Sequence, residues 1–174
     1  MKVLIINGSF RKGSFNKALS EIGKKALLKE GIEVSSFPIE TLPFLNQDLE
    51  KDLPSPVKES AKAVEEADVL WVFSPEYNHE MPAVLKNAFD WWSRQRVDGV
   101  PILKEKPLLV SGIGGGNATK SMQKALKELA LFLGMKPLEP SFEGRLPVSV
   151  WQTGVYAPSE TDIQGIEAQA KSLL

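Results

Sequence analysis

The stretch Asn7-Gly8-Ser9-Phe10-Arg11-Lys12-Gly13-Ser14-Phe15-Asn16 joins an apolar run to a helical pattern. The residues before it, Val3-Leu4-Ile5-Ile6, have the composition of a buried strand, and apolar side chains recur at helical spacing after the stretch. A turn rich in hydroxyl groups and glycine between a strand and a helix directs the free amides at the start of the helix toward one point, where they bind an anion. The order strand, turn and helix therefore predicts a phosphate-binding α/β unit.

Positive charge gathers in this turn. The first 20 residues contain no Asp or Glu, whereas Arg11, Lys12 and Lys17 lie in the turn or directly after it. The local field therefore favours a phosphate, although the net charge of the whole chain is only -1. The side chains that we expect to receive the anion are those of Ser9, Arg11, Ser14 and Asn16. The alternative is a solvated Ser/Gly loop without a ligand.

Length and composition restrict the class of protein. The chain has 174 residues, which suits one domain with a sizeable core, so we expect a single domain over residues 1–174. Its 21 basic and 22 acidic residues form no run of like charge, which argues against a nucleic-acid partner or a membrane surface. The absence of cysteine excludes disulfides, thiol nucleophiles and thiolate metal ligands. The apolar opening is too short for a signal peptide and no segment is long enough to span a bilayer, so we expect a cytoplasmic protein.

Short apolar runs alternate with longer amphipathic ones along the chain, which is the pattern of a parallel sheet with helices on both faces. We expect five strands, over residues 2–7, 33–37, 69–73, 107–111 and 136–142. We expect helices over residues 14–30, 56–67 and 82–96, a fourth that ends near 134, and a last one from 159. The run at 69–73 is uniformly apolar, so it belongs in the centre of the sheet. The predicted fold class is α/β, with a five-stranded parallel sheet in the order 2-1-3-4-5.

Three loops follow the first, third and fourth predicted strands. They are the first loop (residues 8–16), the third-strand loop (residues 74–81) and the glycine loop (residues 112–117). The carboxyl ends of parallel strands form the ligand-binding edge of such a sheet, and in the order 2-1-3-4-5 the first and third strands are neighbours at the switch point. A phosphate in the first loop would therefore place an attached flat ring between the other two loops.

Three segments together resemble the NAD(P)H-dependent FMN reductases, a family with a flavodoxin-like fold that includes bacterial quinone, azo-dye and chromate reductases. The segments are GSFRKGSFN at 8–16, SPEYN at 74–78 with PAVLKNAFDW at 82–91, and SGIGGG at 111–116. The resemblance covers most of the chain. It implies FMN as cofactor, NADPH or NADH as electron donor, and a quinone, azo compound, free flavin or similar small molecule as acceptor.

The resemblance also implies roles for single residues. The FMN phosphate would be held by Ser9, Arg11, Ser14 and Asn16, with Phe15 in the same segment. The isoalloxazine would be lined by Pro75, Glu76, Tyr77 and Asn78, and on its other side by Ser111, Gly112, Gly114 and Gly115. His79 and Met81 stand where the nicotinamide or the acceptor would stack. Because the hydride chemistry belongs to the flavin, we expect no catalytic side chain and a ping-pong scheme. With one histidine and no cysteine we expect no metal site, and the resemblance implies a homodimer or homotetramer.

Other motifs fit this chain less well. GIGGGN at 112–117 begins like a dinucleotide fingerprint, but it ends in Asn and follows the fourth predicted strand. No GxxxxGK[ST] phosphate loop occurs, Ser111 lacks the preceding glycine of a nucleophile elbow, and the chain has one histidine. Nucleotide hydrolysis and triad chemistry are therefore disfavoured. Asp48, Glu50 and Asp52 are interpreted as a solvated loop rather than a metal site.

Several aromatic residues and two rival functions stay open. Trp91 lies on a different helical face from Phe89 and Trp92, which makes it a candidate for a subunit interface, whereas Trp151 and Tyr156 receive no role. The first rival is a flavodoxin-like electron carrier, although a net charge of -1 does not provide the acidic docking surface of such carriers. The second is a domain that binds another phosphorylated ligand without redox chemistry.

Overall fold

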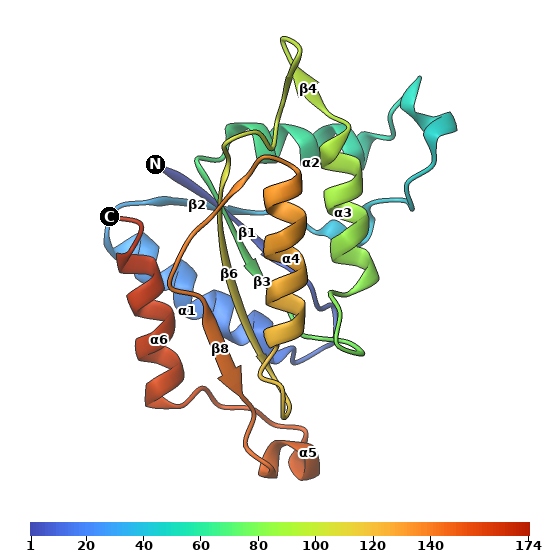
Figure 1. The fold of residues 1–174 in the computed structure, drawn as a ribbon. Helices are drawn as coiled ribbons and strands as arrows, with labels where there is room; N and C mark the ends of the chain where they lie inside the picture. The colour runs from blue at the N-terminus through green and yellow to red at the C-terminus, as the bar shows by residue number, and fades with distance from the viewer.

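Parallel strands form the centre of the fold. The computed structural model describes residues 1–174, and its main sheet has the strand order β2-β1-β3-β6-β7, with β8 paired to β6 as well. All pairings in this sheet are parallel. The strands are β1 (Lys2–Asn7), β2 (Glu33–Ser36), β3 (Val69–Phe73), β6 (Pro107–Gly114), β7 (Lys136–Pro137) and β8 (Phe142–Arg145) (Figure 1). The predicted α/β class with a parallel sheet is confirmed.

Helices cover both faces of the sheet. Figure 1 shows α1 and α6 next to each other on one face and α2, α3 and α4 on the other. The helical elements are α1 (Phe15–Lys29), η1 (Ile39–Thr41), η2 (Gln47–Glu50), α2 (Ser55–Glu66), α3 (Ala83–Ser93), α4 (Lys120–Phe132), α5 (Ser149–Thr153) and α6 (Glu160–Lys171). None of these helices has both the length and the apolar composition needed to cross a membrane.

The central strand β3 divides the core into two layers. All five of its residues are buried, as its uniformly apolar sequence predicts. Leu70 and Val72 belong to the cluster under α2, α3 and α4, whereas Trp71 and Phe73 belong to the cluster under α1 and α6. This alternation follows from the two-residue period of a strand, so a central strand needs apolar residues at every position.

The fifth predicted strand is broken into two. β7 pairs with Pro107 and Leu108 at the start of β6, whereas β8 pairs with residues 111–114 at its end. Pro137 and Pro140 lie in and after β7, and proline has no N–H to donate to the ladder. The expectation of one continuous strand over 136–142 was wrong for this reason.

A second difference lies after α3. This helix ends at Ser93 rather than near residue 96, and the chain forms an antiparallel hairpin of β4 (Arg96–Val97) and β5 (Val100–Pro101). Asp98 and Gly99 make the connection with φ angles of 50° and 80°. An Asp-Gly pair with two positive φ angles is a preferred two-residue hairpin turn, so the sequence did carry the signal.

Trp91 is an internal residue. Its side chain is fully buried in the same cluster as Trp92 and Phe89. Its Nε1 donates a hydrogen bond of 2.7 Å to the carbonyl oxygen of Pro43, in the segment that crosses from β2 to α2. The prediction of an exposed interface residue was wrong, because this long connection covers the second face of α3.

Candidate functional site

The predicted loops meet around one cavity of about 410 Å³ at the carboxyl edge of the sheet, which we call the edge cavity. The first loop contributes Ser9, Arg11, Ser14, Phe15 and Asn16. The third-strand loop contributes Pro75, Glu76 and Tyr77, and the end of β6 contributes Ile113, Gly114 and Gly115. The last wall comes from the chain after β8, which we call the tail segment (residues 146–156).

The start of α1 carries free donors at one end of the edge cavity. Ser14 is the N-cap, and its Oγ accepts a hydrogen bond of 3.3 Å from the N–H of Lys17. The N–H groups of Phe15 and Asn16 have no hydrogen-bond partner within the chain. Unpaired amides at a helix N-terminus, next to the hydroxyl of the nearly buried Ser9, form a binding site for a phosphate.

Arg11 lies at the mouth of this anion site. Its guanidinium stacks over the ring of Phe15, with 4.1 Å between Cζ and the ring centroid, and its Nη2 donates to the carbonyl oxygen of Gly13 at 3.1 Å. The side chain is exposed and forms no ion pair with a carboxylate of the chain. The stacking therefore orders a charge that remains free for a ligand.

The side chain of Asn16 does not bind the phosphate as expected but has a structural role. Its Nδ2 donates to the carbonyl oxygen of Ile113 at 3.1 Å, and its Oδ1 accepts from the N–H of Ile113 at 2.9 Å. The side chain is 97% buried. Its side-chain amide thus joins the first loop to the end of β6, so this side chain positions the two loops and leaves only the backbone N–H of Asn16 free for a phosphate.

Glu76 joins the third-strand loop to α4. Its Oε1 accepts from Nδ2 of Asn117 at 2.7 Å and its Oε2 from the N–H of Met122 at 3.1 Å. Burial alone raises the pKa of this carboxyl, but the hydrogen bonds from Asn117 and from the backbone of Met122 and Ser121 outweigh it and lower the pKa. Because α4 has no side-chain N-cap of its own, the ionised Glu76 stabilises the start of that helix.

The tip of the third-strand loop turns away from the cavity. The N–H of Tyr77 donates to the carbonyl oxygen of Glu80 at 3.0 Å, and the N–H of Glu80 donates back to Tyr77 at 3.0 Å. Between them, Asn78 and His79 have φ angles of 52° and 63°, as in a tight hairpin turn. Both are exposed and neither lines the edge cavity, and Met81 packs against the core cluster under α3 instead.

The glycine loop places only its later residues in the cavity. Gly114 and Gly115 line it, whereas Ser111 is fully buried inside the sheet. The Oγ of Ser111 accepts from Nε1 of Trp71 at 2.7 Å and donates to Oε1 of Gln169 at 2.5 Å. At Gly112 a Cβ would lie 2.4 Å from Oγ1 of Thr119, so this glycine permits close packing rather than ligand contact. β6 extends three residues further than expected, to Gly114. Ser111 and Gly112 therefore lie within the strand rather than in the loop at its end.

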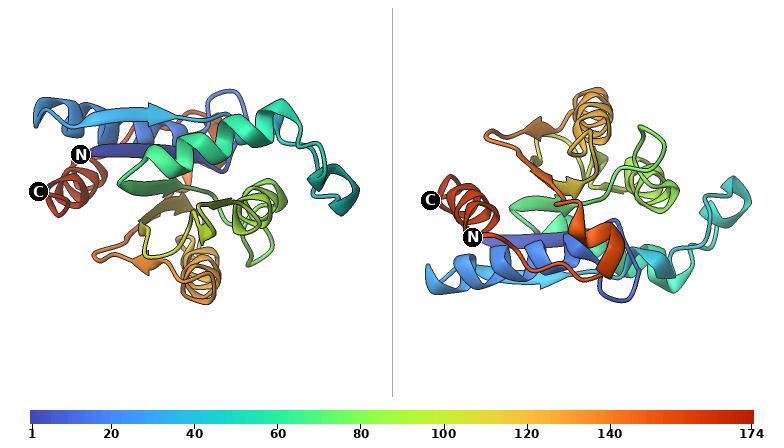
Figure 2. Two further views of the ribbon diagram at one scale, coloured as in Figure 1. Left: turned by 90° about the horizontal axis from the view of Figure 1, so that it is seen from above. Right: turned by 90° about the horizontal axis from the view of Figure 1, so that it is seen from below.

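The tail segment is the part of the site that the sequence did not reveal. It adds Leu146, Val150, Trp151 and Gly154 to the edge cavity. The indole of Trp151 is 64% exposed, and a Cβ on Gly115 would lie 3.3 Å from its Cζ2. The view from below in Figure 2 shows α5, which carries Trp151, beside the chain that follows β1. A lone exposed tryptophan in a polar tail gives no sequence signal of such a position.

Tyr156 anchors this segment to the first loop. Its ring packs against that of Phe15, with 5.3 Å between the centroids, and its hydroxyl donates to Oδ2 of Asp162 at 3.0 Å. Burial and the neighbouring Asp162 carboxylate raise the pKa of the Tyr156 hydroxyl. The hydroxyl therefore stays protonated and acts as a structural donor.

Comparison with known proteins identifies relatives of the chain. The family model described as NADPH-dependent FMN reductase matches residues 1–143. An NAD(P)H:quinone oxidoreductase of Solanum tuberosum is 37% identical over 141 residues, which cover 78% of this chain and 70% of that protein. The tail segment, with Trp151, lies beyond the matched part of the family model.

Solved structures show the same fold. The flavoenzyme NAD(P)H:(acceptor) oxidoreductase FerB from Paracoccus denitrificans superposes with a TM-score of 0.84 at 28% identity, covering 98% of this chain and 93% of that one. A flavodoxin of Streptococcus pneumonia superposes with a TM-score of 0.66 at 16% identity, covering 99% of this chain and 97% of that one. The second similarity concerns the fold alone, which is flavodoxin-like.

Proposed function

The chain belongs to the NADPH-dependent FMN reductase family, and on this premise we propose that it transfers a hydride from NAD(P)H, through FMN in the edge cavity, to a small acceptor such as a quinone. The main support for placing FMN in the edge cavity is that the two ends of the cavity differ in chemistry. Free amides, a serine hydroxyl and the unpaired charge of Arg11 lie at one end, and Pro75, Tyr77 and two glycines lie at the other. A phosphate tethered to a flat ring matches this division.

The residues of the first loop fit the FMN phosphate. The N–H groups of Phe15 and Asn16 and the Oγ of Ser9 supply neutral donors, and the Arg11 guanidinium supplies the opposite charge. The Oγ of Ser14 accepts from the backbone of Lys17, and its own hydrogen remains available to the phosphate.

The isoalloxazine has a wall on each side in this proposal. Pro75, Tyr77 and the backbone after Glu76 form one wall, and Gly114 and Gly115 allow the backbone of the other wall to approach a ring closely. Trp151, which was not among the expected residues, adds a further aromatic surface to that of Tyr77. The two clamps, Asn16 on Ile113 and Glu76 on Met122, hold these walls at a fixed spacing before any ligand enters.

FMN, when bound, supplies the redox chemistry, in which NAD(P)H and one proton are converted with a quinone to NAD(P)⁺ and a hydroquinone. The protein positions the reactants and keeps fixed dipoles near the ring. Glu76 is the one ionisable side chain of the edge cavity that is even partly buried, and its hydrogen bonds hold it ionised. We therefore propose that the chain provides no general acid and that the proton comes from solvent. Because donor and acceptor would use the same exposed ring face, we propose a ping-pong scheme.

Steady-state kinetics test this scheme. We expect double-reciprocal plots for NADPH at several fixed benzoquinone concentrations to be parallel, and lines that intersect would contradict the shared site. An azo dye and free FMN replace benzoquinone in parallel assays to compare acceptors. The cytoplasmic location, the single domain over residues 1–174 and the homodimer or homotetramer remain predictions.

A further inference from the structure

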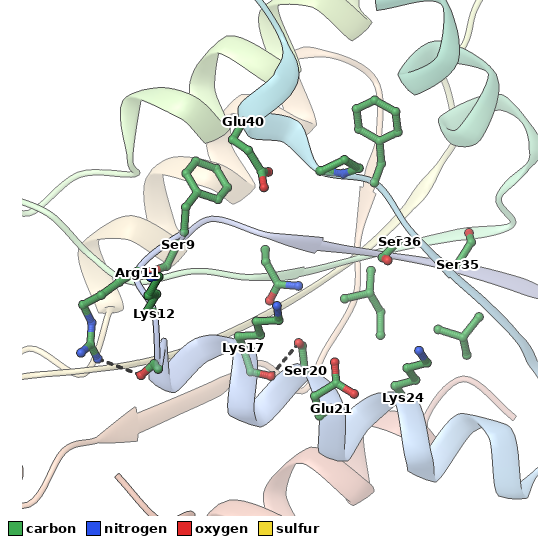
Figure 3. A pocket seen from close by; sticks show the side chains of 17 residues that line it. Ser9, Arg11, Lys12, Lys17, Ser20, Glu21, Lys24, Ser35, Ser36 and Glu40 are labelled. Carbon is green, nitrogen blue, oxygen red and sulfur yellow. Dashed lines mark hydrogen bonds between the residues drawn. The ribbon is translucent and has the colours of Figure 1, made fainter. Parts of the chain in front are cut away.

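A second cavity of about 480 Å³ lies on the other side of the first loop, and we call it the side cavity. Ser9 and Arg11 line both cavities, so the first loop forms a common wall. The side cavity extends over β1 and β2 on the face covered by α1, and the segment from β2 to η1 closes it from above (Figure 3). Nothing in the proposed reductase function uses this space.

The side cavity has an excess of positive charge. Arg11, Lys12, Lys17 and Lys24 line it, against the two carboxylates of Glu21 and Glu40. None of these six side chains takes part in an ion pair. Lys17 and Lys24 are seven residues apart on α1, so they project from the same face of that helix, as Figure 3 shows. Uncompensated cations around a hollow favour an anionic ligand.

A buried acceptor at the floor of the side cavity lacks a partner. The Oδ1 of Asn7 is buried and accepts no hydrogen bond. Asn7 follows Val3 and Ile5 in the alternation of β1, so its side chain lies on the α1 face, where the side cavity is. Buried polar atoms without a partner are uncommon, and a sugar hydroxyl or an amino group of a ligand would supply the donor that this one lacks. It does not line the edge cavity, so FMN placed there would leave it unpaired.

Hydroxyl groups and two aromatic rings complete the lining. Ser20 and Ser36 present small polar side chains from α1 and from the end of β2. Phe10 is 45% exposed at the edge of the side cavity, and Phe37 lies across it on the segment after β2. A flat base can pack on either ring.

We propose that the side cavity binds a phosphorylated nucleoside. The phosphate lies between Lys17 and Lys24, a ribose hydroxyl donates to Asn7, and the base packs on Phe10 or Phe37. Two sources have this chemistry: the adenosine 2'-phosphate end of NADPH, and a free nucleotide that occupies the site independently. The first source rests on the proposed reductase function, and the second does not.

Calorimetry with the FMN-loaded protein tests the proposal, with 2',5'-ADP as the probe. We expect saturable binding of one molecule per chain. The double variant Lys17→Gln/Lys24→Gln weakens it by at least about tenfold, because two charge-assisted contacts are lost. Lys25→Gln is the matched control, since Lys25 is exposed on the same helix next to Lys24 but does not line the side cavity. It changes binding less than about twofold.

A second variant works by adding charge. Ser36 is exposed at the end of β2, so Ser36→Glu places a carboxylate at the rim without disturbing the core, and we expect it to weaken 2',5'-ADP binding as well. Absence of binding to the wild type overturns the proposal, and so does an equal loss in Lys25→Gln. The flavin absorbance of the same samples reports FMN retention separately, so failure of the edge cavity is distinguished from failure of the side cavity.

Inhibition kinetics show whether the ligand of the side cavity is part of NADPH or a free nucleotide. If the donor supplies the ligand, 2',5'-ADP competes with NADPH, and Lys17→Gln/Lys24→Gln raises the KM for NADPH but not for NADH. If a free nucleotide is the ligand, 2',5'-ADP binds with the same dependence on the two lysines while the KM for NADPH is unchanged. Both results support the side cavity as a nucleotide site.

Discussion

Asn16 and Ile113 are held together by a pair of hydrogen bonds between the side-chain amide of the first and the backbone of the second, at 3.1 and 2.9 Å. The two residues are 97 positions apart in the chain. The pair joins the loop after β1 to the end of β6, across the carboxyl edge of the sheet. This buried amide therefore helps to hold two walls of the edge cavity in place.

Asn16→Ala removes both bonds and leaves the backbone groups of Ile113 without partners. We expect the free energy of unfolding to fall by about 2 to 4 kcal/mol, because two buried groups lose their hydrogen bonds. Urea unfolding measures the change. Gln47→Ala serves as the control, since Gln47 is exposed and its side chain makes no hydrogen bond, and a similar small effect of both variants would contradict the role of Asn16.

Arg11→Ala removes the charge at the mouth of the anion site. We expect the free energy of FMN binding to become less favourable by about 1.5 to 3 kcal/mol, the contribution of a hydrogen bond to a charged group. Fluorescence titration of FMN measures it. Lys12→Ala should have a smaller effect, because Lys12 lines the side cavity but not the edge cavity. Unchanged affinity in Arg11→Ala would exclude contact with the phosphate.

Glu76→Gln tests the anchor between the third-strand loop and α4. The folded state lowers the pKa of Glu76 below 4.5, so its carboxylate contributes stability above that pH and loses the contribution as the pH falls through the folded-state pKa. We expect wild type to be more stable than Glu76→Gln at pH 7, and the difference to shrink at acid pH. The urea midpoints of the two proteins at each pH give this difference in stability. A difference that does not change with pH would contradict the stabilising role of the ionised Glu76 carboxylate.

Trp151 should report on ligands in the edge cavity. It is the one exposed tryptophan, since Trp71, Trp91 and Trp92 are fully buried. We expect Trp151→Phe to remove a long-wavelength part of the emission that FMN quenches. We further expect Trp151→Ala to raise the KM for benzoquinone by about 2- to 10-fold, the equivalent of a lost aromatic contact. An unchanged KM would place Trp151 outside the acceptor site.

The sequence predicts the fold well where apolar runs are long. β1 and β3 have the predicted bounds, because each is a run of apolar residues that ends at a polar or breaking residue. The strand over 136–142 was predicted less well, since its two prolines and short length leave no clear period. The Asp98-Gly99 hairpin turn carried a signal that the helical pattern before it concealed.

The candidate site was predicted in part. The first loop, Pro75–Tyr77 and Gly114–Gly115 do meet at one cavity, because the order of parallel strands places their carboxyl ends together. Ser111 and Asn78 lie outside it, because β6 is extended by its pairing with the distant β8, and because the local turn at 77–80 carries Asn78 beyond the cavity lining. Trp91 was misplaced because a helical wheel cannot show that the distant Pro43 covers its second face. Trp151 comes from a tail that is held by tertiary packing, with Leu146 and Val150 in the core and Tyr156 against Phe15.

The most direct test of the central claim is the absorbance spectrum of the purified protein after incubation with FMN and removal of the excess, followed by anaerobic addition of NADPH and, separately, NADH. We predict flavin bands that remain with the protein and bleach faster than those of free FMN. Bands that wash away, or that NAD(P)H bleaches no faster than free FMN, would contradict a flavin reductase built on the edge cavity.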